Sequence, residues 1–272
     1  MPTAEWINLV FFSFFMVVSW LRPLTVRARI AIAVIGAIGI ILIVVADFAD
    51  RFLASASVSV VHDWLPAALI PVMYWQAGCF AATLNDRFQR TLQKLDNRFL
   101  GNWMQRLTTQ RSYRWIFKCL ELAYFSCYPL VPLGLGVLYL AHMRRYAAEY
   151  WLVVLSATYP CYVFTAFVQT LPPRLLETDP IHAVPSKIRT LNLWIVRRVT
   201  TRFNTFPSGH VTATFGGSLV LLRHLPGVGF VFLLVSIGIA LGAVTGRYHY
   251  AVDVVLGVAL AVAVHSLERL FT

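Results

Sequence analysis

Two short stretches of the sequence carry histidines in settings suited to chemistry on a phosphate. The first is Phe206-Pro207-Ser208-Gly209-His210. Pro207 and Ser208 favour the start of a helix, and Gly209 lets the backbone approach a ligand closely. Because the first N–H groups of a helix have no intrahelical partner, such a junction can bind an anion. His210 stands beside it as a side chain able to donate a proton near neutral pH.

The second stretch runs from Gly246 to Asp253 and reads Gly-Arg-Tyr-His-Tyr-Ala-Val-Asp. His249 and Asp253 are four residues apart, so on a helix they share one face. The carboxylate would hold one imidazole nitrogen and leave the other free as a nucleophile or base. Arg247 adds a planar fork that suits phosphate oxygens. Either stretch alone would also fit a turn, a cap or a solvated histidine, so the hypothesis depends on their combination.

The elements that must position these residues are membrane helices. The 272 residues are 58% hydrophobic and 13% charged, with a mean hydropathy of +0.68, whereas soluble domains carry about 25% charged residues. The apolar residues form continuous blocks of the length that crosses a bilayer. We therefore expect an all-α polytopic membrane protein with about eight transmembrane helices. The expected spans are 6–21, 28–46, 63–84, 117–141, 150–170, 209–223, 226–245 and 250–269.

A polar break at 47–62 predicts a boundary in the chain. Residues 1–58 would form two accessory transmembrane helices, and residues 59–272 a six-helix catalytic core. The N-terminus lacks the early basic residues of a signal peptide, so we expect the first helix to be retained. The four cysteines lie in apolar spans without a Cys-x-x-Cys pair, which favours packing roles over zinc or disulfides. They are Cys79, Cys119, Cys127 and Cys161.

Residues 85–116 show the pattern of an amphipathic helix. Apolar residues recur every third or fourth position, at Phe88, Leu92, Leu95, Phe99, Trp103 and Leu107. Basic residues on the other faces predict a helix that lies in the head-group plane of the membrane. The alternative is an ordinary amphipathic helix packed on a loop.

The charges also bear on sidedness and partners. Counting eight spans, the 85–116 segment, the loop 171–206 and the turn 246–249 face one side of the membrane. The positive-inside rule would make that side cytoplasmic, but basic residues kept for phosphate binding would give the same bias, so the side stays open. The net charge of +11 favours anionic lipid head groups as partners, and we expect no nucleic acid partner.

These motifs resemble a known family. Pro207-Ser208-Gly209-His210, followed by His249-x-x-x-Asp253 at a later helix start, resembles the type 2 phosphatidic acid phosphatase superfamily. The stretch 247–257 is similar to the branch of that superfamily with inositol-phosphorylceramide-synthase-like proteins. So are Leu171-Pro172-Pro173-Arg174 and the segment from Tyr124 to Pro129. The resemblance covers residues 60–272 and implies a six-helix core.

The resemblance also implies roles. His249 would attack phosphorus and form a phosphohistidine, Asp253 would orient it, and His210 would protonate the leaving oxygen. The phosphoryl oxygens would be held by Arg174, Arg247, Ser208 and the N–H of Gly209. Neither a metal nor another cofactor is implied, because arginines would stabilise the charge.

The sequence departs from the family pattern at two basic positions. Phe167 stands where the first motif usually has a lysine, and Ala243 where the third usually has an arginine. We expect other basic residues to supply the missing charge. The candidates are Arg247, Lys187, Arg198 and Arg202.

The leading hypothesis is a membrane lipid phosphatase that hydrolyses a lipid-linked phosphate in a bacterial plasma membrane. A phosphotransferase that moves a phospho-head group to an alcohol is the alternative. A transporter is more distant, because charge deep in the spans is confined mainly to Glu121 and Asp253, and we expect Glu121 to be a structural partner. The remaining histidines are expected to be surface or interfacial: His62, His142, His182, His224 and His265.

Overall fold

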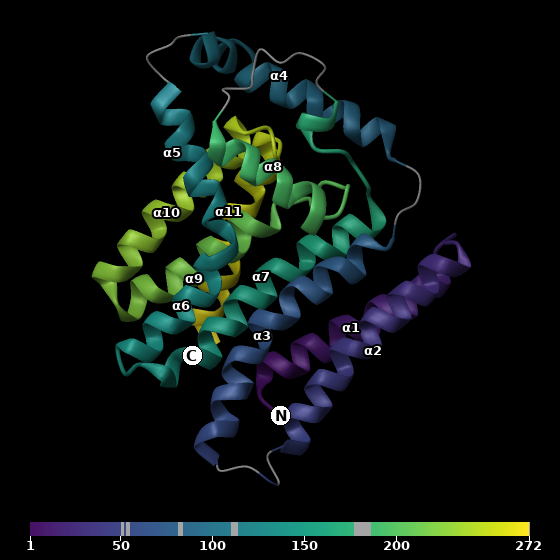
Figure 1. The fold of residues 1–272 in the computed structure, drawn as a ribbon, viewed down its shortest axis with the longest axis vertical. Coiled ribbons are helices and arrows are strands. Elements are labelled where there is room, and N and C mark those ends of the chain that lie inside the picture. The colour runs from purple at the N-terminus through teal and green to yellow at the C-terminus, as the bar shows by residue number, and fades with distance from the viewer. Residues whose placement is uncertain (50–51, 53–54, 81–83, 110–113, 177–185, 272) are drawn as a thin grey trace.

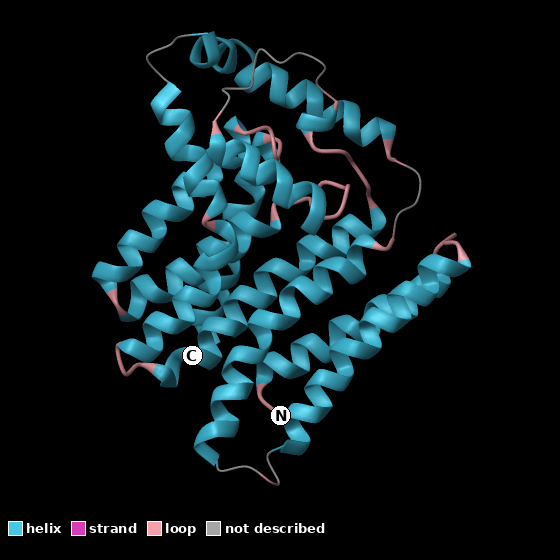
Figure 2. Cartoon of the chain, in the orientation of Figure 1, coloured by secondary structure: helices cyan, strands magenta, loops and turns pink. Residues whose placement is uncertain are grey.

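The computed structural model describes residues 1–49, 52, 55–80, 84–109, 114–176 and 186–271, with the backbone alone at 55–58 and 102–109. Figure 2 shows that this part of the chain is almost wholly helical. The one β-like feature within it is an isolated antiparallel bridge between Thr170 and Asn204. The predicted all-α fold is therefore confirmed.

Every expected span contains helix, and Figure 1 shows how the helices are arranged. The bounds are α1 Thr3–Leu21, α2 Val26–Ala49, α3 Ser55–Gly78, α4 Asp86–Thr109, α5 Arg114–Phe125, α6 Cys127–Leu140, α7 Ala147–Phe167, α8 Lys187–Val199, α9 Gly209–His224, α10 Pro226–Thr245 and α11 Ala251–Phe271. Two short 3-10 turns are η2 Arg144–Tyr146 and η3 Pro173–Leu175.

Fewer helices are long and apolar enough to cross a membrane than the eight expected. Five of the described segments pass that test: α1, α2, η2 with α7, α10 and α11. A sixth passes if the bent pair α5–α6 counts as one span. The helices α3 and α9, which lie in the expected spans 63–84 and 209–223, do not pass it. α9 has 16 residues, whereas about 20 are needed to cross a bilayer. It packs between α7, α10, α11 and α6, so its polar residues are shielded from lipid.

The expected span 117–141 is broken in the middle. α5 and α6 meet at an angle of 58°. Pro129 explains the break, because it has no N–H for the carbonyl of Phe125 four residues earlier and its ring collides with that carbonyl. Phe125 is the residue at which α5 ends. The start of α6 is packed inside the protein, where Cys127 is 4% exposed.

The helix predicted within 85–116 is α4, which lies across one end of the bundle (Figure 1). It is packed on loops through Gln89, Leu92 and Asp96, which are buried. Gln89 donates to the carbonyl of Leu171 at 3.3 Å and to the hydroxyl of Tyr250 at 2.5 Å. The side chains of Trp103 and Leu107 lie outside the described residues. The position of α4 in the head-group plane stays a prediction.

α8 was not predicted, since the sequence suggested a polar loop over 171–206. Its start is capped by Ser186, whose hydroxyl accepts the N–H of Arg189 at 3.1 Å. Only Asn192 and Val196 of this helix are buried. α8 therefore lies on the surface at the same end of the bundle as α4 (Figure 1).

α1 and α2 share a continuous core with α3 and α7. The amide of Gln76 on α3 donates to the carbonyls of Phe12 at 3.2 Å and Ile32 at 3.0 Å, so it binds all three helices together. His62 is 8% exposed and pairs with the buried Glu5, so the expectation of a surface histidine was wrong there. His182 lies outside the described residues. The domain boundary near residue 58 stays a prediction.

Candidate active site

Three of the predicted site residues line one polar pocket at the end of the bundle that α4 and α8 cover. They are Arg174 from η3, His210 from the start of α9 and His249 from the connection between α10 and α11. Tyr124, Asn204 and Tyr248 contribute to the same wall. Residues as far apart in sequence as Tyr124 and His249 therefore meet here.

The connection that carries His249 is fixed by hydrogen bonds to the end of α10. Arg247 has a left-handed backbone with φ 61°, and its N–H donates to Val244 at 3.1 Å. The N–H groups of Tyr248 and His249 both donate to the carbonyl of Ala243, at 2.9 and 3.0 Å. This is the Schellman pattern that ends helices, with arginine where glycine is usual. The backbone at His249 is thereby held against α10.

Asp253 orients His249 from the first turn of α11. Its Oδ2 accepts from His249 Nδ1 at 3.4 Å, from the N–H of Tyr250 at 3.0 Å and from Asn204 Nδ2 at 2.7 Å. A carboxylate on Nδ1 selects the tautomer that leaves Nε2 unprotonated. Nε2 is then the ring nitrogen available as a nucleophile.

α9 and α11 are docked so that the two histidines share the pocket. The N–H of Ser208 donates to the backbone carbonyl of Asp253 at 3.0 Å. At Gly257, an added Cβ would lie 2.9 Å from Thr212 Oγ1 and 3.1 Å from the carbonyl oxygen of Ser208. The close approach of the two helices at this point therefore requires glycine.

His210 packs against two tyrosines on either side of the α5–α6 break. Its ring contacts Tyr128 with centroids 5.4 Å apart and Tyr124 at 6.4 Å, both edge to face. Tyr124 also stacks on Tyr248 with centroids 4.0 Å apart and planes at 1°. The bend at Pro129 thus brings α5 and α6 against His210 and fixes the plane of its ring.

Arg174 is a partly buried cation whose hydrogen bonds go to backbone carbonyls. Its backbone N–H donates to the carbonyl of Arg247 at 3.0 Å, and Nη1 donates to the carbonyl of Tyr248 at 3.3 Å. Among the described residues, no carboxylate forms an ion pair with it. Burial lowers the pKa of Arg174, although a guanidinium stays charged. Such a group favours an anion in the pocket.

Arg247 was predicted to bind phosphate, but the structure pairs it with an acid. Its Nη1 donates to Asp96 Oδ2 of α4 at 2.6 Å, and both side chains are at most 8% exposed. Asp96 Oδ1 also accepts the N–H of Ala251 at 2.9 Å. Arg247 lines a neighbouring hollow with Arg90 and Lys94 instead of the pocket of the two histidines.

Ser208 and Gly209 of the first motif make contacts that differ from those expected. The N–H of Gly209, predicted to hold a phosphoryl oxygen, donates to Thr205 Oγ1 at 3.4 Å. Ser208 precedes α9 as predicted, but its hydroxyl does not cap the helix. Among the described residues, Ser208 Oγ, Asn204 Oδ1 and Asp253 Oδ1 are buried without a hydrogen-bond partner. Buried polar atoms of this kind are usually satisfied by water or a ligand.

A basic hollow of about 370 Å³ adjoins the pocket. The two share Arg174, Val196, Thr200 and Thr201. Three further arginines line the hollow: Arg189, Arg197 and Arg202. Of the three candidates outside the motif for the missing basic residues, Arg202 is the one that lies there.

Glu121 holds α8 against α5. Its carboxylate accepts from Arg189 at 2.5 Å, Asn192 at 2.8 Å and the hydroxyl of Tyr248 at 2.8 Å. Burial and the negative charge of Glu121 raise the pKa of Tyr248, so Tyr248 stays a neutral donor. Glu121 has the structural contacts expected of it.

Sequence reasoning missed Asn204, Asp96 and Gln89, each of which holds a motif residue or its loop. None stands in a recognisable motif, and each acts across more than 45 positions of sequence. The available signal was a polar residue in an otherwise apolar or basic setting. Within the described residues, no group of three or more His, Cys, Asp and Glu side chains could hold a metal ion.

Comparison with known proteins gives one family. Residues 90–267, more than half of the chain, match the family model described as PAP2 superfamily. A PA-phosphatase related-family protein from Dictyostelium discoideum is 43% identical over 51 residues, which are 19% of this chain and 9% of that protein. The similarity therefore spans a small part of that relative. No solved structure matches the chain.

Proposed function

Since this chain belongs to the PAP2 superfamily, we propose that it is a membrane lipid phosphatase that works through a phosphohistidine on His249. Family membership supports a phosphatase-type enzyme acting on a lipid phosphate. The observation that carries the proposal is the pocket in which His249, His210 and Arg174 meet. Asp253, which lies outside the pocket lining, holds His249, and Asn204 in the pocket wall donates to Asp253.

The first step transfers the phosphoryl group to the enzyme. Nε2 of His249 attacks phosphorus, the bond from phosphorus to the lipid oxygen breaks, and His210 gives its proton to that oxygen. Asp253 stabilises the positive charge that develops on His249. Arg174 binds the phosphoryl oxygens throughout, because its cation lines the pocket and no carboxylate of the described residues pairs with it.

The second step frees the enzyme. His210, now neutral, takes a proton from a water molecule as the water oxygen attacks the phosphohistidine. The bond from phosphorus to Nε2 breaks and inorganic phosphate leaves. No step needs a metal ion, and we expect activity to survive a chelator.

A phosphotransferase is the second candidate. The basic hollow that shares Arg174 and Thr200 with the pocket has room for a polar alcohol that would take the place of water. This candidate accords with the resemblance to inositol-phosphorylceramide-synthase-like proteins. A bacterial plasma membrane as the host membrane is part of the proposal. We also propose that α4, α8 and the basic loops around the site face the lipid head groups.

Phosphate release from phosphatidic acid, a polyprenyl diphosphate and phosphatidylglycerol phosphate, with chelator present, tests the proposal. We expect His249→Ala to abolish release, and His210→Ala to lower kcat by roughly 10²- to 10⁴-fold, the usual worth of a general acid. A phosphorylated intermediate that is labile in acid should form in the wild type and be missing in His249→Ala. The matched control is His142→Asn, an exposed histidine with φ 57°, where asparagine tolerates the backbone.

The outcomes separate the candidates. Release that needs an added alcohol, with the phosphate recovered on that alcohol, would identify the transferase. A phosphoenzyme that persists in His249→Ala would refute the assignment of the nucleophile. No release and no phosphoenzyme from a folded wild type would refute the enzyme hypothesis itself.

A further inference from the structure

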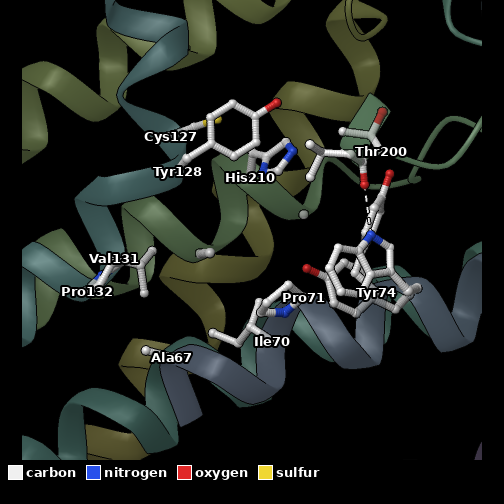
Figure 3. A pocket seen from close by; sticks show the side chains of 15 residues that line it. Ala67, Ile70, Pro71, Tyr74, Cys127, Tyr128, Val131, Pro132, Thr200 and His210 are labelled. Atoms are coloured by element: carbon white, nitrogen blue, oxygen red, sulfur yellow. Dashed lines mark hydrogen bonds between the residues drawn. The ribbon is translucent and has the colours of Figure 1, made fainter. Parts of the chain in front are cut away.

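An apolar cavity of about 280 Å³ lies between α3, α6, α7 and α9 (Figure 3). Ile70 and Pro71 of α3 form one side, and Val131 and Pro132 of α6 the other. Among the described residues, no charged side chain apart from His210, when it is protonated, lines this cavity. The proposed chemistry leaves the cavity without a role.

The cavity is continuous with the polar pocket. Tyr74, Thr200 and His210 line both, and Figure 3 shows His210 and Tyr128 at its upper edge, with Ala67 and Ile70 on the opposite wall. The side of the pocket on which the leaving oxygen would receive its proton is therefore the side that opens into apolar space. Arg174 lines the pocket and the basic hollow but is not among the residues that line the cavity.

We propose that this cavity binds one hydrocarbon chain of the substrate, namely the chain attached to the oxygen that leaves. The inference rests on the proposed function and specifies its substrate as a phosphate ester with a long apolar chain. When the phosphorus–oxygen bond breaks, its electron pair stays on the lipid oxygen, which takes the proton of His210. The resulting alcohol still has its chain in the cavity.

The size and lining of the cavity argue for one chain. Sites for small molecules occupy about 300–1,000 Å³, so this cavity is at the lower limit and would not hold a complete two-chain lipid. Most of the wall is apolar, so a polar acceptor would find partners only at side chains such as Tyr128, Thr200 and His210, and burying it unpaired elsewhere would be costly. A hydrocarbon chain loses only contact with water or lipid.

The wall of the cavity also reaches the outer surface of the molecule. Trp75 and Val199 line it, and each is 43% exposed. Trp75 Nε1 donates to the carbonyl of Val199 at 2.8 Å, which joins α3 to the end of α8. A second chain, or the rest of a long chain, would therefore continue into the bilayer from this edge.

The test compares two substrates with the same head group, hexadecyl phosphate and butyl phosphate. Ala67→Phe places a ring in the cavity, and we expect it to lower kcat/KM for hexadecyl phosphate by roughly tenfold or more, because it displaces several buried methylenes. Activity on butyl phosphate should stay at the wild-type level, which also reports folding. Ala68→Phe is the matched control, since Ala68 is exposed on the same helix.

A second variant covers the case in which Ala67→Phe fails to fold. Ile70→Ala enlarges the cavity and should move the preferred chain length upward. Equal loss on both substrates in Ala67→Phe, with no change of chain preference in Ile70→Ala, would overturn the inference. So would a wild type that shows no preference for the longer chain.

A binding experiment separates this inference from the proposed function. A dibrominated dodecanol should quench the fluorescence of Trp75 in wild type and in Ala68→Phe, and quench it less in Ala67→Phe. Trp75→Phe identifies the signal. Quenching by a wild type that releases no phosphate would support the chain site while refuting the phosphatase. No quenching of Trp75 would refute the chain site directly.

Discussion

Three groups meet at the carboxylate of Asp253 that orients the proposed nucleophile His249, and they differ in how far the sequence predicts them. Asp253 stands four residues from His249, so the spacing alone predicted their contact. The N–H of Tyr250 follows from the helix start. Asn204 donates to the same carboxylate oxygen although it is 49 residues away in sequence, and no local pattern indicates this contact. A carboxylate with three donors on one oxygen is strongly restrained.

Asn204→Ala should lower kcat without a matching rise in KM. The substitution removes a hydrogen bond to a charged group, worth about 1.5–3 kcal/mol, so kcat should fall roughly 10- to 150-fold while substrate still binds Arg174. Steady-state kinetics and thermal unfolding in detergent, measured together, check this. An unchanged kcat with a lower melting temperature would mean that Asn204 only stabilises the fold.

The contact that Arg247 makes in the structure could not be predicted from the sequence. Its type and its place beside His249 suggested phosphate binding, but its side chain lies against Asp96 of α4. The left-handed backbone at position 247 and an acid 151 positions away set this contact, while phosphate binding by Arg247 stays a prediction. Neither the backbone conformation nor the acidic partner can be read from the neighbouring sequence.

At the scale of the elements, the apolar blocks of the sequence predicted most of the helices. How closely the helices pack depends on the small residues between them. Pro129 was visible in the sequence, but whether it kinks a span or only starts a helix depends on packing. α8 escaped prediction because a short amphipathic helix with many arginines has the composition of a loop. Its contacts with Glu121 lie 68 and 71 positions away.

The spacing between α9 and α11 can be tested at Gly257. Gly257→Ala should separate the two helices by a few tenths of an ångström at Ser208 and disturb the pocket. Since a misplacement of about 1 Å can cost 100-fold, we expect activity to fall by about ten- to a hundredfold. Gly227→Ala is the control, because an added Cβ there meets nothing within 4 Å. Equal activity of the two variants would contradict the role given to this contact.

At the scale of the whole molecule, basic residues gather where the site lies. α4 and α8 carry exposed arginines and lysines around the pocket, among them Arg87, Arg90, Lys94, Arg98 and Arg197. The chain as a whole has a net charge of +11. The sequence predicted the excess of charge and its grouping on common loops, while the structure adds that these loops meet through Gln89 and Arg174.

Raising the salt concentration should weaken activity on anionic vesicles more than on neutral ones. Exposed charges are screened beyond about 10 Å at 0.1 M salt, and each basic residue near an anionic surface contributes about 1 kcal/mol. Arg98→Gln should therefore raise KM several-fold on anionic vesicles at low salt. Arg145→Gln, an exposed arginine at the far end of α6, should not. A KM that ignores salt would show that the basic end does not contact the membrane surface.

The polar pocket and the apolar cavity share only a small part of their walls, and this affects how the substrate preference of such an enzyme could change in evolution. The polar pocket is built mainly by η3, the loop 200–205 after α8, the start of α9 and the turn after α10, whereas α3 and α6 form most of the apolar cavity. Only Tyr74, Thr200 and His210 belong to both. Substitutions on α3 and α6 could therefore alter which chains are accepted while the catalytic groups stay untouched, so that new substrate preferences could evolve one region at a time.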